Sequence, residues 1–235
     1  MGYEMKLCIA LDMPSAKENL ELLELLGKNF AQKEIWVKVG LRSFIRDGVG
    51  FLEKIKKINP YYQIFLDLKL YDIPNTMGDA MSEIAKLQVD MVTLHSSSGR
   101  EAMNEVAKRL KNLTNPPLIM AVTALTSFDK KGFNEIYNAN LESKVQDFAQ
   151  IAYECGMNGV VCSVWESKAI KEMLSDEFLT LTPAIRPFWE KSDDQKRTAN
   201  LQEAKEAQSD FIVVGRPIYA AENPKAVFQK ILENL

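Results

Sequence analysis

The sequence predicts an α/β fold, a (β/α)8 TIM barrel that forms a single domain over residues 1–235. Three observations support this prediction. Eight short apolar runs begin between residues 6 and 211 at a mean spacing of about 29 residues, the length of one strand, one helix and two short loops. The segments between the runs carry helical periodicity. The runs are continuously apolar, which is typical of parallel strands covered on both faces.

The expected strands are rich in β-branched and other apolar side chains and are bounded by polar or turn-forming residues. They are residues 6–12, 34–40, 62–69, 91–95, 117–124, 159–163, 178–185 and 211–216. Eight alternating strand and helix units in one domain favour a closed barrel. A doubly wound open sheet is the alternative, but no Gly-x-Gly-x-x-Gly follows the first strand, which weakens a dinucleotide-binding fold.

Helical signals fill the intervals between the strands. Ser15 and Glu18 have the spacing of a capping box, and a broad leucine face follows them up to Gly27, a plausible residue to end the helix. Apolar residues at helical spacing predict further helices, of which the clearest cover residues 44–55, 145–152 and 227–235.

Composition excludes several classes of protein. Hydrophobic residues make up 46% and charged residues 26% of the chain, as in ordinary globular proteins. The net charge is −3, and the short basic stretch 54–57 adjoins Glu53, so we expect no nucleic-acid partner. Three cysteines and one histidine form no CxxC or HExxH motif, which argues against a metal site. The odd cysteine number fits a reducing cytosol, and no apolar stretch approaches 18 residues, so we expect a cytoplasmic protein without a membrane partner.

The most informative candidate site begins with Asp67-Leu-Lys69-Leu-Tyr-Asp72. Asp67 and Lys69 are two residues apart on an expected strand, so their side chains should share one face. Asp72 lies just past this strand. Lys38 lies at the end of the preceding strand, which we expect to be its neighbour. The four residues therefore predict an alternating set of two cations and two anions.

Four buried charges are tolerable when each has neighbours of opposite sign. The carboxylates should keep Lys69 in its charged form, which suits a general acid that delivers a proton to a developing carbanion. The alternative is an ion-pair network that merely closes the barrel. We favour the functional interpretation because the set lies at the carboxyl end of the strands, where barrel enzymes carry their active sites.

A second candidate site follows the last two strands. Arg186 comes after the seventh strand, and Gly215 and Arg216 come after the eighth, where barrel enzymes often bind phosphate. Exposed salt bridges are the alternative for either arginine alone. Thr126 fits equally well as a contact to a polar ring and as a helix cap. We interpret His95 as a core or interface histidine rather than a catalyst.

These residues lie in motifs that resemble one enzyme family. The string from Asp67 to Thr76, Asp-Leu-Lys-Leu-Tyr-Asp-Ile-Pro-Asn-Thr, resembles the signature of the orotidine 5′-monophosphate decarboxylases of the bacterial, single-domain type. The other motifs follow the family's order from about residue 6 onward. They are Ala10-Leu-Asp12, Val37-Lys38-Val-Gly40, Val122-Thr-Ala-Leu-Thr126-Ser, Thr182-Pro-Ala-Ile-Arg186-Pro, Asp194-Gln195-Lys-Arg and Val214-Gly215-Arg216-Pro. One departure is Ala184, where the family usually has glycine. We expect a local change of the loop or a negative φ there.

The resemblance implies decarboxylation of orotidine 5′-monophosphate to uridine 5′-monophosphate and CO2, the last step of de novo UMP synthesis in pyrimidine biosynthesis, with no metal and no organic cofactor. It implies that Lys69 protonates ring carbon six, that Asp67 lies against the departing carboxylate, and that Lys38 and Asp72 complete the charge set. It assigns the remaining contacts as follows: the ribose to Asp12 and Lys38, the pyrimidine to Thr126, and the phosphate to Gln195, Gly215 and Arg216 with Arg186 nearby.

The resemblance also implies a homodimer, in which Asp72 and Thr76 reach the partner's site. Residues 188–196 would form a lid over the phosphate, with Gln195 as its contact.

Two alternatives stay open. A keto-gulonate-phosphate decarboxylase shares Asp-x-Lys-x-x-Asp but uses Mg2+, and the extension from Ile73 to Thr76 argues against it. A catalytically silent phosphate-binding barrel is the other, and it would have no need for a charged lysine beside carboxylates.

Overall fold

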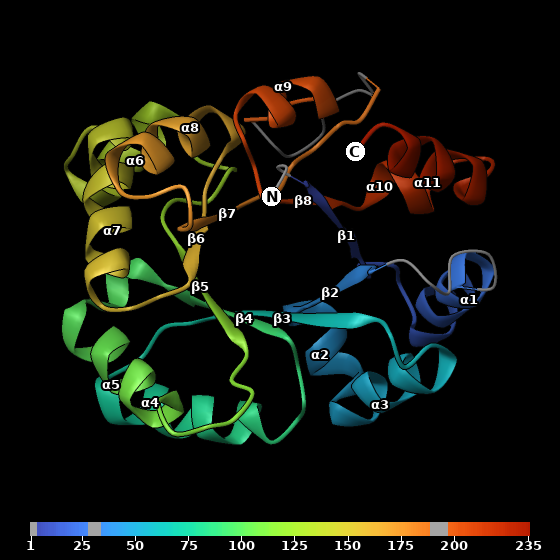
Figure 1. The fold of residues 1–235 in the computed structure, drawn as a ribbon, viewed down its shortest axis with the longest axis horizontal. Helices are drawn as coiled ribbons and strands as arrows, with labels where there is room; N and C mark the ends of the chain where they lie inside the picture. Colours follow the sequence, from blue (N-terminus) through green and yellow to red (C-terminus); the bar gives the residue numbers. More distant parts are fainter. Residues whose placement is uncertain (1–3, 28–33, 189–196) are drawn as a thin grey trace.

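The structure, a computed structural model, describes residues 4–27, 34–188 and 197–235. Eight parallel strands pair in chain order, and β1 pairs with β8 to close the barrel. In Figure 1 the strands surround the centre, and the helices form an outer ring. The predicted (β/α)8 barrel is therefore confirmed, and the open-sheet alternative is wrong.

Each observed strand matches one predicted run. The strands are β1 Lys6–Ala10, β2 Trp36–Gly40, β3 Gln63–Leu70, β4 Met91–His95, β5 Leu118–Val122, β6 Gly159–Val161, β7 Leu179–Thr182 and β8 Phe211–Val214. Most predicted runs extend past the observed strand at the carboxyl end, as at Thr123 and Ala124 after β5. Those extra residues form loops at the end of the barrel where the pocket lies.

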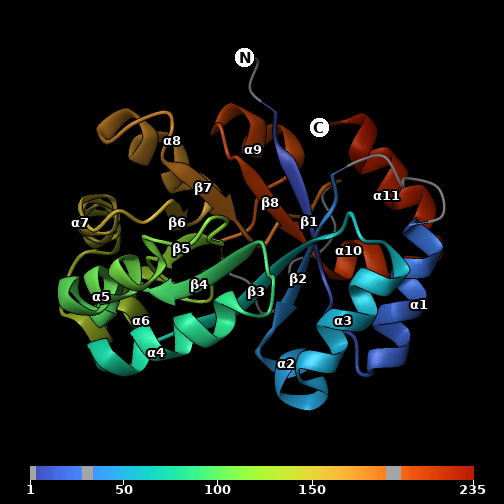
Figure 2. The same cartoon turned by 60° about the horizontal axis from the view of Figure 1, so that its bottom comes forward.

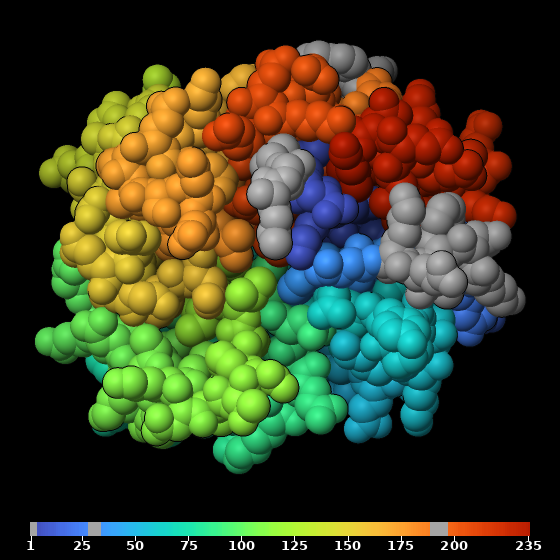
Figure 3. All heavy atoms as spheres, in the orientation of Figure 1, coloured from blue at the N-terminus to red at the C-terminus, as the bar shows by residue number. Residues whose placement is uncertain are grey.

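The helices lie outside the strands (Figure 2), and α11 returns beside α1 to complete the ring. They are α1 Ala16–Gly27, α2 Leu41–Asp47, α3 Val49–Ile58, α4 Pro74–Ala85, α5 Arg100–Leu110, α6 Lys130–Tyr137, α7 Leu141–Glu154, α8 Val164–Met173, α9 Leu201–Glu206, α10 Arg216–Tyr219 and α11 Pro224–Glu233, with a short 3-10 helix at Ser96–Ser98. In Figure 3 the colours run around the centre in sequence order, as this topology requires. No helix in the described ranges is long and apolar enough to cross a membrane.

The single helix expected over residues 44–55 is wrong. Gly48 has a φ of +62°, which separates α2 from α3. Phe51, Leu52 and Ile55 of α3 are buried, whereas Ile45 of α2 is 78% exposed. The apolar spacing therefore predicted helical structure correctly. It did not reveal the break at Gly48 or the exposed position of Ile45 on α2.

Two apolar clusters stabilise the barrel. Side chains that point outward from the strands pack against the helices, as Leu7, Val37 and Leu66 do. Side chains that point inward fill the barrel below the pocket, and Trp36 meets Phe211 there edge to face at 5.1 Å. Each fully buried large side chain contributes about 1.5–3 kcal/mol. Because inward side chains fill the interior in the described part of the chain, we expect a ligand to bind at the carboxyl end of the strands.

Candidate active site

An open pocket of about 280 Å³ lies at the carboxyl ends of the strands. Its lining comes from seven strands or the loops that follow them: Ala10, Asp12, Lys38, Phe65, Asp67, Lys69, Val122, Ala124, Leu125, Thr126, Ser127, Val161, Leu181, Pro183, Ala184, Arg186, Val213, Gly215, Arg216 and Tyr219. Charged groups from the loop after β1 and from β2 and β3 line it, and the loops after β7 and β8 contribute two arginines.

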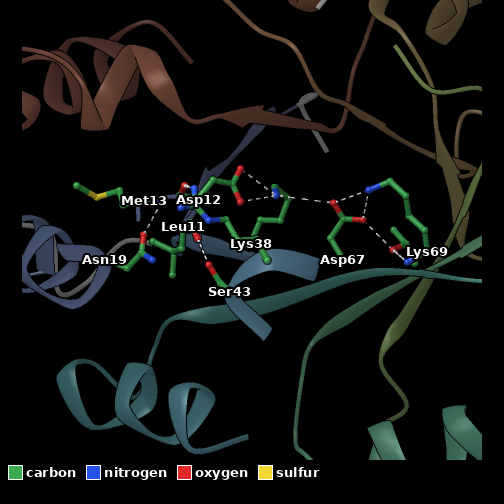
Figure 4. Close-up of polar contacts among 10 residues, drawn as sticks. Leu11, Asp12, Met13, Asn19, Lys38, Ser43, Asp67 and Lys69 are labelled. Carbon is green, nitrogen blue, oxygen red and sulfur yellow. Dashed lines mark hydrogen bonds and ion pairs between the residues drawn. The ribbon is translucent and has the colours of Figure 1, made fainter. Parts of the chain in front are cut away.

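The charged groups form a continuous row, Asp12–Lys38–Asp67–Lys69, which Figure 4 shows linked by ion pairs. Lys38 Nζ lies 3.2 Å from Asp12 Oδ1 and 3.8 Å from Asp67 Oδ2. Lys69 Nζ donates to both Asp67 oxygens, at 2.8 and 2.9 Å. The side chains of Lys38 and Asp67 are only 13% and 12% exposed, so water screens their attraction weakly.

Opposite charges keep the buried members of this row ionised. Burial alone would lower the pKa of Lys38, but Asp67 and Asp12 raise it above the ordinary lysine value. Burial alone would raise the pKa of Asp67. The charges of Lys38 and Lys69, with hydrogen bonds from Lys69 and Thr93, lower it below the ordinary aspartate value. The pocket therefore presents a fixed carboxylate between two ammonium groups.

The backbone places Lys69 differently from a regular strand. Its φ is +50°, in the left-handed region, and the pairing of β3 with β4 shifts register between Leu66 and Leu70. Lys69 and Asp67 therefore reach the same pocket through a bulge rather than through simple alternation. The Thr93 hydroxyl contacts both residues across this bulge. Thr93 was not predicted as a site residue, although the alternation of the expected strand 91–95 places it on the inward face beside Asp67.

Gly40 makes room for the Lys38 ammonium. Lys38 lies inside β2, two residues before its end, rather than at the end as expected. A Cβ at Gly40 would lie 3.0 Å from Lys38 Nζ and 3.4 Å from Asp12 Oδ1. The absence of a side chain at Gly40 therefore leaves space for Lys38 Nζ beside Asp12.

The loops after β7 and β8 carry Arg186, Gly215 and Arg216 into the pocket. Arg186 is buried, and its backbone N–H donates to the Ala199 carbonyl at 2.8 Å, which fixes the start of this loop. Gly215 precedes the short helix α10, which begins at Arg216. Two cationic side chains therefore line the same pocket as the row Asp12–Lys38–Asp67–Lys69.

Thr126 and Ser127 enter the pocket from the loop after β5. Arg197 supports this loop from outside, because its guanidinium donates to the carbonyls of Ala124 and Leu125, both at 3.3 Å, and pairs with Glu166 at the start of α8. This anchor was missed by sequence analysis, since nothing in the spacing of Arg197 and Glu166 indicates contact.

A family model described as "Orotidine 5'-phosphate decarboxylase / HUMPS family" matches residues 5–231. The chain belongs to this family. It is 61% identical over 231 residues to "Orotidine 5'-phosphate decarboxylase" of Wolinella succinogenes and 59% identical to that of Nitratiruptor sp., covering 98% of this chain and 100% of each relative. The solved structure of orotidine 5'-phosphate decarboxylase from Lactobacillus acidophilus has a TM-score of 0.84 at 32% identity, covering 98% of this chain and 99% of that one.

Two residues of the family's signature lie outside the pocket of this single chain. Asp72 is exposed and accepts the Ile73 N–H at 2.7 Å, and Thr76 is exposed on α4. Within the described ranges Asp72 makes no ion pair with either lysine, so the four-residue set expected from the sequence does not form in one chain. Asp12 completes the row in its place.

Two other positions of the family motifs are Ala184 and Gln195. Ala184 lines the pocket with a φ of +65°, so the expected negative φ is wrong and the alanine adopts the left-handed conformation. Left-handed backbone costs a non-glycine residue about 1–2 kcal/mol. Gln195, and with it the expected lid from residue 189 onward, lies outside the described residues.

His95 has partners that fit a structural histidine. Its Nδ1 accepts the Ser97 N–H at 3.2 Å, and its ring stacks on Tyr71 with centroids 5.9 Å apart. Burial and then the charge of Lys69 lower the pKa of His95, which favours the neutral ring. The residue is not among those that line the pocket.

Proposed function

We propose that this chain decarboxylates orotidine 5′-monophosphate to uridine 5′-monophosphate and CO2 without a cofactor. The observation that carries the proposal is the row Asp12–Lys38–Asp67–Lys69 in the same pocket as Arg186 and Arg216. A phosphorylated, carboxylated substrate needs cations at one end and a proton donor at the other. Relatives at 59–61% identity carry this activity as their name.

In the proposed reaction the bond between C6 and the carboxylate breaks, and its electron pair stays on C6. CO2 leaves, and the Lys69 ammonium donates the proton that forms the new C6–H bond. Lys69 then regains a proton from solvent. No cofactor delocalises the electron pair, so the fixed cation supplies the stabilisation as charge develops. Asp67, held ionised and buried, lies against the departing carboxylate and disfavours that charged ground state.

The rest of the pocket binds the nucleotide. Asp12 and Lys38 hold the ribose hydroxyls, and Thr126 faces the pyrimidine. Gln195, Gly215 and Arg216 hold the phosphate with Arg186 nearby. The phosphate lies away from the reacting carbon, so its binding energy serves to order the loops around the reacting groups.

The active form in this proposal is a cytoplasmic homodimer, in which Asp72 and Thr76 of each chain act in the partner's site. The exposure of Asp72 supports this arrangement, since no ion pair holds its carboxylate within the described part of the chain. Exposed apolar side chains near the signature, Tyr71 at 66% and Ile73 at 65%, suit a surface that a second copy covers.

The test is the loss of orotidine 5′-monophosphate absorbance when purified protein is added in excess chelator. Turnover supports the proposal. Failure to turn over this nucleotide, combined with Mg2+-dependent decarboxylation of a keto-gulonate phosphate, would support the sugar-phosphate enzyme instead.

A further inference from the structure

Thr93 is a fully buried residue of β4 whose hydroxyl contacts both charged residues that β3 sends into the pocket. The Lys69 backbone N–H donates to Thr93 Oγ1 at 2.9 Å. Thr93 Oγ1 lies 2.9 Å from Asp67 Oδ1 and donates to it. One hydroxyl therefore links the backbone of the proposed proton donor to the carboxylate beside it.

The register of the sheet explains why a side chain is needed here. Leu66 pairs with Val92 and Leu70 pairs with Leu94, so residues 67–69 of β3 face the single residue Thr93. A regular ladder would give the Lys69 N–H a backbone carbonyl as its partner. In this bulge the Thr93 oxygen takes that place, while Lys69 adopts its left-handed φ of +50°.

The direction of the two hydrogen bonds follows from chemistry. A backbone N–H can only donate, so Thr93 Oγ1 must accept from Lys69. Its own proton is then available for Asp67, where it favours the ionised carboxylate. Because the threonine side chain is β-branched and wholly buried, its rotamer is restricted, and both contacts have a fixed geometry.

We propose that Thr93 is a positioning residue for the decarboxylation: its hydroxyl holds the Lys69 backbone and the Asp67 carboxylate in the bulged register that aims both at the substrate. This inference rests on the function proposed above. Thr93 itself is not among the residues that line the pocket and acts only through its two neighbours.

The test compares variants that differ in the hydroxyl. Thr93→Val keeps the shape and removes the hydroxyl, whereas Thr93→Ser keeps it. We expect valine to lower kcat by about 10- to 100-fold, the size of a lost hydrogen bond to a charged group, with KM changed less than about threefold. Serine should stay within about threefold of the wild-type kcat. Thr93→Ala and Thr93→Ser provide the same comparison if valine disrupts folding, since they differ by the hydroxyl alone.

Thr180→Val is the matched control. Thr180 is also a fully buried strand threonine whose hydroxyl donates to a carboxylate, Asp210, at 3.3 Å, but it is not among the pocket-lining residues. The Thr180→Val variant should be less stable than wild type, while its folded fraction keeps the wild-type kcat. If the hydroxyl-free Thr93 variants match the serine variant in kcat, or if Thr180→Val loses kcat equally, the positioning role is refuted. An inactive wild-type protein would instead refute the proposed function.

Discussion

Replacement of Lys38 by methionine should destabilise the protein in a strongly pH-dependent way. Methionine keeps most of the apolar stem of the lysine and removes its charge. In the native structure the ammonium lies between Asp12 and Asp67, 3.8 Å from the Asp67 carboxylate. The variant leaves Asp67 buried with Lys69 as its remaining cation.

The magnitude follows from this geometry. Two unit charges 3.8 Å apart attract by about 4 kcal/mol at an effective dielectric constant near 20. Removal of one partner of a buried ion pair typically costs about 3–5 kcal/mol. We therefore expect Lys38→Met to lower the free energy of unfolding by about 3–5 kcal/mol at pH 7.

The sign of the pH dependence comes from Asp67. Its folded pKa lies below the ordinary value, so its contribution to stability is present above the unfolded pKa and is lost as pH falls through the folded pKa. Without Lys38 the folded pKa of Asp67 rises, and the buried carboxylate, left with Lys69 as its remaining cation, costs stability only where it is ionised. The difference between wild type and variant should thus be largest near pH 7 and should shrink as pH falls toward about 4.

Urea denaturation at several pH values between 4 and 7 measures this difference. Lys6→Met is the matched control, because the Lys6–Glu34 pair at 3.0 Å is exposed, and it should cost less than about 1 kcal/mol at any pH. A Lys38→Met loss below about 1 kcal/mol at pH 7, or a loss that does not change with pH, would refute the electrostatic reasoning.

Three further predictions concern activity. Arg216→Ala should weaken binding of the nucleotide by about 30-fold or more relative to binding of the bare nucleoside, since a buried charged contact is worth about 2–5 kcal/mol. Equal losses of affinity for both ligands would show that the phosphate binds elsewhere. Gly40→Ala should lower kcat about tenfold by displacing Lys38 Nζ, whereas Gly50→Ala, with nothing within 4 Å of its added Cβ, should keep kcat; equal activity of the two variants would contradict the role of Gly40. Lys69→Ala and Asp72→Ala homodimers should each be nearly inactive. When the two variants are mixed in equal amounts and exchange subunits fully, about a quarter of the sites should be wild-type. A mixture no more active than its parents would place Asp72 in its own chain's site.

The sequence predicted the barrel well because its signal is repeated. Each strand is a continuous apolar run, and each covering helix repeats apolar residues at the helical period. Because this pattern occurs eight times, the prediction of a barrel does not depend on any single strand and helix unit. The break at Gly48 was not predicted, because the apolar spacing from Phe44 to Phe51 continues across it. A positive φ at one glycine leaves no trace in periodicity.

The site was less predictable because its geometry depends on contacts between distant segments. Asp67 and Lys69 were found from their motif, but the bulge that joins them to Thr93 is a matter of register between two strands. Arg197 and Glu166 meet across 31 residues, and Asp12 joins the row only when β1 and β2 pair. Local sequence identifies which groups are charged, whereas the closed sheet decides which of them touch.

The most direct test of Lys69 as the proton donor is the turnover of orotidine 5′-monophosphate by Lys69→Ala in excess chelator, beside wild type and the surface variant Lys86→Ala. A missing general acid should lower kcat by roughly 100- to 10,000-fold or more, while circular dichroism shows a folded protein and uridine 5′-monophosphate still binds. Lys86, exposed and paired with Glu83, should keep wild-type turnover. Near-normal turnover by Lys69→Ala would show that another group delivers the proton to C6.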